Sequence, residues 1–156
     1  MKRFTIYIIG ALLVCWCTSV AFARIGENEE QIEARYGKSV VADPKGPHGP
    51  QIALFKINGM EIGVTFRDGK SVMEIYSNQD LSRISANEIR LLLDANAAAG
   101  TWEKSNSGLP MWKLNPEGCV ATLSMDGRKF AVFGKGYVDI SNVEREKAEK
   151  EKLKGF

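Results

Sequence analysis

Two side chains in the sequence could support nucleophilic or acid–base chemistry. His48 is the single histidine and lies in the proline- and glycine-rich stretch DPKGPHGP, whereas Cys119 is the one cysteine after residue 23. A cysteine nucleophile needs a base that lowers its pKa, and His48 is the only imidazole available for that role. A Cys119–His48 pair is therefore one hypothesis. The simpler interpretation is an exposed loop histidine and a buried cysteine that acts as a small hydrophobic residue.

Motifs for other catalytic or metal chemistry are missing after residue 23. The patterns G-x-S-x-G, H-E-x-x-H and C-x-x-C do not occur there. The short run Gly134-Lys135-Gly136 is not followed by a helix signal, so we interpret it as a turn or bulge between strands and not as a phosphate-binding loop. We expect no catalytic residue, no metal ion, no cofactor and no enzyme activity.

The stretch Arg67-Asp68-Gly69-Lys70 gathers three charges and a glycine between two apolar runs. An Asp-Gly pair recurs at Asp126-Gly127, 58 residues after the first. A catalytic cluster has no reason to recur at a matching place, whereas a hairpin turn does, because Asp-Gly supplies the positive φ angles of a tight turn. Both pairs are therefore predicted to be hairpin turns.

Binding residues are sought among the large aromatic side chains beside the expected strands. Trp and Tyr are common at interface hot spots and equally common in cores. Trp112 is expected in the core, and Trp102, just past Gly100, is placed to cover a helix end. The exposed sheet face and the loop 43–50 are the expected recognition surfaces. The candidate binding residues are Trp102, Trp112, Tyr76 and His48.

Residues 1–23 have the three parts of a secretory signal peptide: Lys2 and Arg3, an apolar run, and a closing Ala-Phe-Ala. Cleavage is expected after Ala23, and the protein is then periplasmic or extracellular. A membrane anchor and a lipoprotein modified at Cys15 or Cys17 are the alternatives. Loss of residues 1–23 leaves 19 basic against 19 acidic residues, so bulk charge does not favour nucleic acid as a partner.

The first half of the remaining chain predicts a short helix followed by three strands. Asn28 and Gln31 form a capping box for a helix over residues 28–36. The pairs Asn58-Gly59 and Asp68-Gly69 then separate three runs with strand character, ALFKI, MEIGVTF and SVMEIY.

The second half predicts the same order of elements. Ser85 and Glu88 form a capping box, and the helix is expected to run through residues 97–99 to Gly100. Strands are expected at MWKL, CVATLSM and KFAVF, and GYVDI (136–140) could add another. The charges of residues 142–156 alternate with i,i+4 spacing, which is typical of a solvated helical tail that could also dock on a partner.

Matching features of the halves lie 57 or 58 residues apart, as Asn58 and Asn115 do. We therefore expect an α+β fold of two helix-plus-antiparallel-meander repeats, 26–78 and 84–140, that form a two-layer helix-on-sheet domain over residues 24–141. The tail follows at 142–156.

The V-x-F-x-D-G-K turn, formed by Val64, Phe66, Asp68, Gly69 and Lys70, lies after a short helix that ends at glycine. This order resembles the small-lipoprotein fold of the outer-membrane assembly machinery (SmpA/OmlA type). In doubled form it resembles the tandem-repeat β-lactamase inhibitor proteins. The chain also looks like short exported proteins of environmental bacteria. The resemblance implies helices on an antiparallel sheet and action by protein–protein contact. The lipid-modified cysteine and the four disulfide cysteines of these families are missing.

The function expected from the sequence is non-catalytic binding of a protein or ligand in the bacterial envelope. One alternative is a secreted inhibitor of an exported hydrolase, which would use an aromatic-rich sheet face. Another is a membrane-tethered envelope assembly component. We expect no nucleic-acid partner and no stable membrane insertion after signal cleavage. The sequence leaves the oligomeric state open.

Overall fold

The computed structural model describes residues 25–43, 51–106 and 108–154. The expected signal peptide, its cleavage site and the candidate residue His48 lie outside these ranges. Within them, no helix combines the length and the apolar composition needed to cross a membrane.

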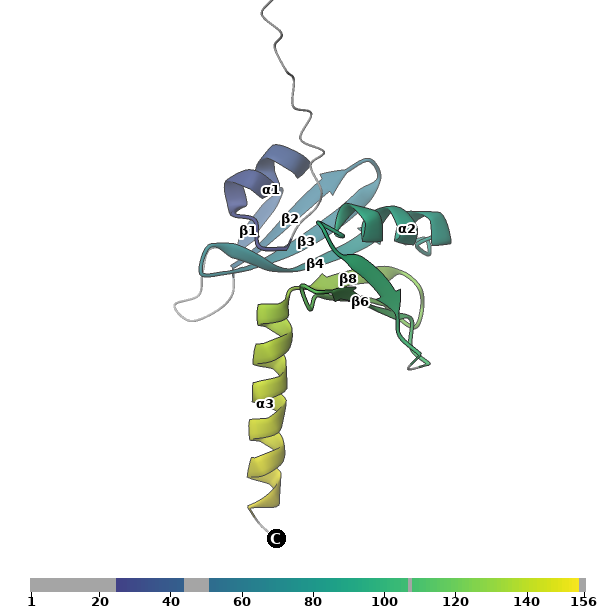
Figure 1. Cartoon of the computed structure of the whole chain (residues 1–156). Helices are drawn as coiled ribbons and strands as arrows, with labels where there is room; N and C mark the ends of the chain where they lie inside the picture. Colours follow the sequence, from purple (N-terminus) through teal and green to yellow (C-terminus); the bar gives the residue numbers. More distant parts are fainter. Residues whose placement is uncertain (1–24, 44–50, 107, 155–156) are drawn as a thin grey trace, which may run out of the picture.

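The strands form one antiparallel sheet in the order β1-β2-β3-β4-β8-β7-β6-β5 (Figure 1). The α+β class predicted from the sequence is confirmed. The strands follow one another as a meander within each half of the chain, and the halves meet where β4 pairs with β8. The strands are β1 (Val41–Asp43), β2 (Gln51–Ile57), β3 (Met60–Arg67), β4 (Lys70–Asn78), β5 (Thr101–Lys104), β6 (Met111–Asn115), β7 (Val120–Leu123) and β8 (Lys129–Phe133).

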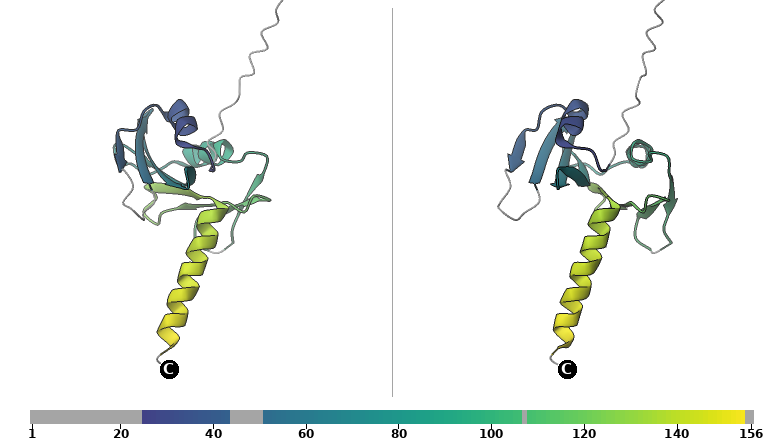
Figure 2. Two further views of the ribbon diagram at one scale, coloured as in Figure 1. Left: turned by 90° about the vertical axis from the view of Figure 1, so that its left-hand side faces the viewer. Right: turned by 60° about the vertical axis from the view of Figure 1, so that its left-hand side comes forward.

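Two short helices, α1 (Glu29–Tyr36) and α2 (Ala86–Ala95), lie on one side of the sheet, which we call the helix side (Figures 1 and 2). Both predicted capping boxes are present, at Asn28 and at Ser85. These caps satisfy backbone N–H groups that a helix start leaves without partners.

Helix α2 ends at Ala95, five residues before the predicted stop at Gly100. The side-chain amide of Asn96 donates to the Leu92 carbonyl oxygen, and Trp102 Nε1 donates to that of Leu93 at 2.8 Å. Side chains thus take up carbonyls that a longer helix would have used. Gly100 has a different role, because a Cβ there would lie only 2.7 Å from the Asn115 carbonyl oxygen.

The turns of the first half agree with the sequence, and one turn of the second half does not. Asn58-Gly59 and Asp68-Gly69 all have positive φ angles of 49° to 79° and close two-residue hairpins. At Asp126-Gly127 only the glycine has a positive φ, 72°. There the Asp126 carboxylate accepts hydrogen bonds from the backbone N–H of Arg128 and the hydroxyl of Ser124, which stabilises a longer loop.

Three segments differ from the sequence-based expectation. Strands β1 and β5 were not predicted, and GYVDI forms no strand. It belongs to α3 (Lys135–Leu153), so the helix begins before residue 142 and the run Gly134-Lys135-Gly136 is a helix start. One turn into α3, Tyr137 packs its ring on Phe133, with centroids 5.3 Å apart.

Helix α3 projects from the sheet away from α1 and α2 (Figures 1 and 2). The predicted i,i+4 ion pairs Arg145–Glu149 and Glu146–Lys150 are present, at 4.0 and 2.7 Å. Both are exposed, so each adds little to stability.

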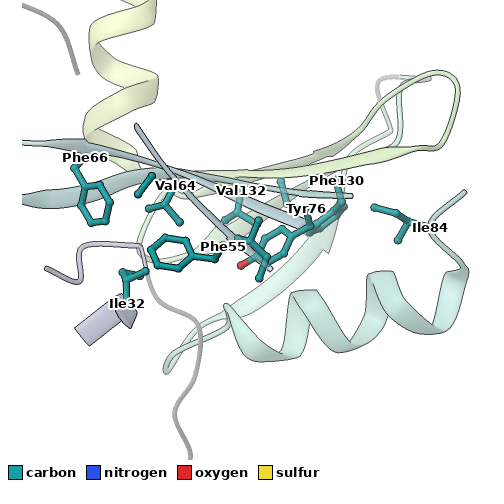
Figure 3. Packing of buried hydrophobic residues seen from close by; sticks show 11 residues of the cluster. Ile32, Phe55, Val64, Phe66, Tyr76, Ile84, Phe130 and Val132 are labelled. Atoms are coloured by element: carbon teal, nitrogen blue, oxygen red, sulfur yellow. The ribbon is translucent and has the colours of Figure 1, made fainter. Parts of the chain in front are cut away.

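The core lies between the sheet and the two helices (Figure 3). Cross-strand registers place its strand residues in two neighbouring rows on the helix side. The rows are Phe55–Ile62–Tyr76–Phe130–Leu123 and Ala53–Val64–Glu74–Val132–Ala121. Ile32 of α1 is fully buried against this surface. The second row therefore places one carboxyl group among four buried apolar side chains.

Candidate functional site

The most unusual group in the core is the carboxyl group of Glu74, which is 0% exposed. Glu74 lies on β4, at the junction of the two halves, between Val64 on β3 and Val132 on β8. A carboxyl group in such a place needs hydrogen-bond partners, because burial of an unpaired polar group costs several kcal/mol.

Two tyrosine hydroxyl groups bond to Glu74 directly, and an asparagine bonds to one of them. The hydroxyl of Tyr36, on α1, donates to Glu74 Oε2 at 3.0 Å, and the hydroxyl of Tyr76 donates to the same oxygen. The two hydroxyl oxygens lie 3.3 Å apart. Asn96, at the end of α2, donates from Nδ2 to the Tyr76 hydroxyl at 3.2 Å. We call these four side chains the Glu74 cluster.

Burial determines the protonation of this cluster. Desolvation raises the pKa of Glu74, and the hydrogen bonds from the tyrosines and the positive charge of Arg35 lower it in part. Burial and the nearby Glu74 also raise the pKa of Tyr76, and they raise the pKa of Tyr36 to about 12. The neutral form of Glu74 is therefore favoured more than in water.

Three buried polar atoms in and beside the cluster have no hydrogen-bond partner among the described residues. They are Glu74 Oε1, Asn96 Oδ1 and Arg35 Nε. Arg35 otherwise pairs with Glu27, and its guanidinium lies over the Tyr36 ring at 5.2 Å from the centroid. Unpaired buried groups are uncommon in folded proteins, so their concentration here indicates a site with unused hydrogen-bonding capacity.

A pocket of about 400 Å³ lies between α1, α2 and the end of the β2–β3 hairpin. We call it the interhelix pocket. Tyr36 and Tyr76 line it, and their hydroxyl groups contact the buried Glu74, which is not part of the lining. Its remaining lining consists of Arg35, Ile57, Asn58, Met60, Ile62, Glu88, Leu92 and Ala95. Predominantly apolar walls with a few polar groups are typical of small-molecule sites.

The structure separates the aromatic residues that the sequence selected as binding candidates. Tyr76 lines the interhelix pocket and is 1% exposed. Trp102 and Trp112 line a second pocket of about 380 Å³ on the other side of α2, together with Asp94 and Lys104. Trp112 also packs edge-on against Phe130 at 5.8 Å, as expected of a core residue. The expected cover of the α2 end by Trp102 is confirmed by its bond to Leu93.

Cys119 is half-buried and is the one cysteine among the described residues. Burial raises the pKa of its thiol, and the nearby Glu117 raises it further. A raised pKa lowers the thiolate fraction, which is the reactive form. The surroundings of Cys119 therefore favour an unreactive thiol.

Sequence reasoning missed Glu74, Arg35 and Asn96 as site residues. The sequence predicted the run SVMEIY only as a strand and assigned no role to its glutamate. The available signal was the alternation that gives Glu74 the same facing as Tyr76, a candidate already selected. Asn96 was hidden because the helix was expected to continue past it.

The sheet face away from α1 and α2 carries no row of aromatic residues. Its central cross-strand row is half-buried and consists of Leu54, Gly63, Ile75, Ala131, Thr122 and Met111. Near α3 it holds a shallow pocket lined by Phe133, Tyr137 and Val138, among others. The aromatic binding candidates Tyr76, Trp102 and Trp112 all lie on the helix side instead.

No family model matches the chain, and no curated protein matches it. Among solved structures it is similar to a cysteine-rich secretory protein from Staphylococcus aureus, at 10% sequence identity and a TM-score of 0.40. The match covers 72% of this chain and 45% of that chain, so this chain spans less than half of its neighbour.

Proposed function

We propose that this chain is an exported, non-catalytic binding protein of the bacterial envelope, and that its ligand site is the interhelix pocket. The observation that carries the proposal is the position of this pocket between two helices and a hairpin. Apolar side chains of α2 and the hairpin line it, and it borders the buried Glu74 cluster. A site of this kind binds through shape and a few polar contacts.

The arrangement of the chain supports a fold of two related helix-plus-meander units. Helix and strands follow in the same order in both halves, and matching turns lie 57 or 58 residues apart. We propose that the units are tandem repeats joined at β4 and β8 in a two-layer domain. The Glu74 cluster would then lie at their junction, where α1, β4 and the end of α2 meet.

The test is a fluorescence titration of the mature chain with N-phenylnaphthylamine, a neutral apolar dye. Ala95 lines the pocket, so Ala95→Trp should fill it and weaken dye binding at least roughly tenfold, because an overfilled site excludes the ligand. Leu91→Trp is the matched control, since Leu91 lies on the same helix and is 51% exposed. Equal dye affinity of the two variants would contradict the proposed site.

Export is tested separately. The intact mass of the protein recovered from its native envelope should correspond to a chain that begins at Arg24. A longer or acylated N-terminus would favour the membrane-tethered alternative instead. Inhibition of an exported hydrolase at one-to-one stoichiometry would favour the inhibitor alternative.

A further inference from the structure

We propose that the interhelix pocket binds a small amphiphile whose polar head presents a hydrogen-bond-accepting oxygen, a carbonyl or a carboxylate, to Tyr36 and Arg35. This inference rests on the proposed function and adds the chemical class of the ligand. Three features of the pocket carry it: the donors on α1, the arrangement of protons in the Glu74 cluster, and the apolar walls.

The first feature is a concentration of donors at the α1 side of the pocket. Arg35 and Tyr36 are adjacent on this helix and both line the pocket. A guanidinium group has donors only. Its Nη2 pairs with Glu27 and its Nη1 lies 3.5 Å from the Tyr36 hydroxyl, while the buried Nε has no acceptor among the described residues. What this side of the pocket lacks is an acceptor.

The second feature is the chain of hydroxyl groups that leads from Glu74 to the pocket. When Glu74 is neutral, its proton on Oε2 can be donated to Tyr76, which also accepts from Asn96. Tyr76 can then donate to Tyr36 across 3.3 Å. This leaves the Tyr36 proton for a ligand, which needs an accepting atom.

Ionised Glu74 has the opposite effect. Both tyrosines then donate to its Oε2, and neither has a proton left for the pocket. Since burial raises the pKa of Glu74, the state in which Tyr36 can donate to a ligand is favoured more than it would be beside a solvated carboxyl group. Ligand binding and protonation of Glu74 should therefore be coupled.

The third feature is the size and polarity of the rest of the pocket. About 400 Å³ holds roughly a dozen water- or methylene-sized groups. Ile57, Met60 and Leu92 supply apolar contact for such a tail. Glu88 on α2 is the one acid in the lining, and its carboxylate already accepts from the backbone N–H and hydroxyl of Ser85. A cationic head held by Glu88 is the competing arrangement.

Isothermal titration calorimetry with three probes of similar length distinguishes an accepting head held by Tyr36 and Arg35 from a cationic head held by Glu88. Octanoate has an ionised accepting head, heptyl methyl ketone has a neutral accepting head, and octylammonium has donors only. We expect octanoate and the ketone to bind, and octylammonium to bind roughly tenfold more weakly, because donors would then face donors. Preference for octanoate over the ketone would identify a carboxylate head, and equal affinity a carbonyl oxygen.

Tyr36→Phe removes the proposed donor and keeps the ring. It should weaken binding of octanoate and the ketone roughly fivefold, as expected for one hydrogen bond. Tyr137→Phe is the matched control, because Tyr137 lies on α3 outside the interhelix pocket. Circular dichroism establishes that both variants fold.

The pH dependence of binding is measured with the ketone, because the ketone has no titratable group. Its affinity should rise as the pH falls through the pKa of Glu74, and Glu74→Gln should make the affinity independent of pH. The groups that face Glu74 are Tyr36 and Arg35 from α1, Tyr76 beside it and Asn96 after α2. The two tyrosines stay neutral, since burial raises the pKa of both. Glu88, which lines the pocket, has a pKa lowered by hydrogen bonds from Ser85, and it remains in the Glu74→Gln variant. Loss of the pH dependence in that variant therefore assigns the dependence to Glu74.

Equal binding of octylammonium and octanoate, or unchanged ketone binding by Tyr36→Phe, would overturn this inference and leave the proposed binding function in place. Failure of every probe, including N-phenylnaphthylamine, would overturn both.

Discussion

The first half of the chain buries a carboxyl group at the point where the second half buries a valine. Glu74 on β4 and Val132 on β8 lie 58 residues apart in the sequence, the same interval that separates the two Asp-Gly turns. In the sheet the two residues are direct cross-strand partners, and both are buried. Two places 58 residues apart thus differ by one ionisable group, which receives hydrogen bonds from Tyr36 of α1 and from Tyr76.

The helices of the two halves differ in how deeply they are buried. Ile32 of α1 is fully buried, whereas no residue of α2 is. Helix α2 instead has a pocket on each side. Tight packing of α1 holds the tyrosine over Glu74, and looser packing of α2 leaves room for a ligand. The first half therefore holds the Glu74 cluster in place, and the second half leaves the pocket open beside it.

The largest loss of stability is expected from a second acid where β4 pairs with β8. Val132→Glu would place a carboxyl group opposite Glu74 without a partner, so we expect a loss of about 4 kcal/mol in the free energy of unfolding near pH 7. Urea denaturation measures it. Lys129→Glu on the same strand is the control and should change stability by less than about 0.5 kcal/mol, because Lys129 is exposed. Similar losses in both variants would contradict the interpretation of the junction.

The helix comparison is tested by truncation on each side. Ile32→Ala should cost about 3 kcal/mol, since its side chain is 0% exposed, whereas Leu92→Ala should cost about half of that because Leu92 is only partly buried. Chemical denaturation of both variants measures the two losses in the free energy of unfolding. Equal costs would show that the two helices contribute alike.

Removal of the central hydroxyl group should be the next largest effect. Tyr76→Phe deletes the group that contacts Glu74, Tyr36 and Asn96, so about 2 kcal/mol should be lost. Tyr137→Phe keeps its ring contact with Phe133 and should be nearly neutral. A neutral Tyr76→Phe would mean that the Glu74 cluster contributes little to stability.

The buried acid should also give the protein a distinct dependence on pH. The pKa of Glu74 is raised above its ordinary value of 4.5, so its contribution to stability is complete below that value and is lost as the pH rises through the folded-state pKa. Relative to Glu74→Gln, the wild-type chain should therefore become less stable as the pH rises above 4.5. Parallel stability profiles of the two proteins would contradict the raised pKa.

The smallest effect concerns the two Asp-Gly turns. Asp68→Gly should leave the melting temperature almost unchanged, because glycine accepts the φ of 51° found there. Asp126→Gly should lower it slightly, since the Asp126 carboxylate bonds to Ser124 and Arg128. Thermal denaturation followed by circular dichroism compares them. Equal shifts would mean that the turns are alike after all.

Local features of the structure were predictable from the sequence. Both capping boxes and the hairpins at Asn58-Gly59 and Asp68-Gly69 depend on neighbouring residues alone, so short motifs specify them. The α+β class follows from the same local signals. Strand β5 and the end of α2 were not predictable, because Trp102, Asn96 and Gly100 act there through contacts with other elements.

The candidate site was decided by tertiary structure. The sequence by itself determined the strand character of residues 71–76 and made Tyr76 a candidate. Alternation puts Glu74 on the same side of the strand as Tyr76, but the burial of Glu74 depends on the pairing of β4 with β8 and on Tyr36, 38 residues away. A carboxyl group in an alternating strand is normally solvated. Only the packing of α1 against the joined meanders gives this one its partners and brings it beside a pocket.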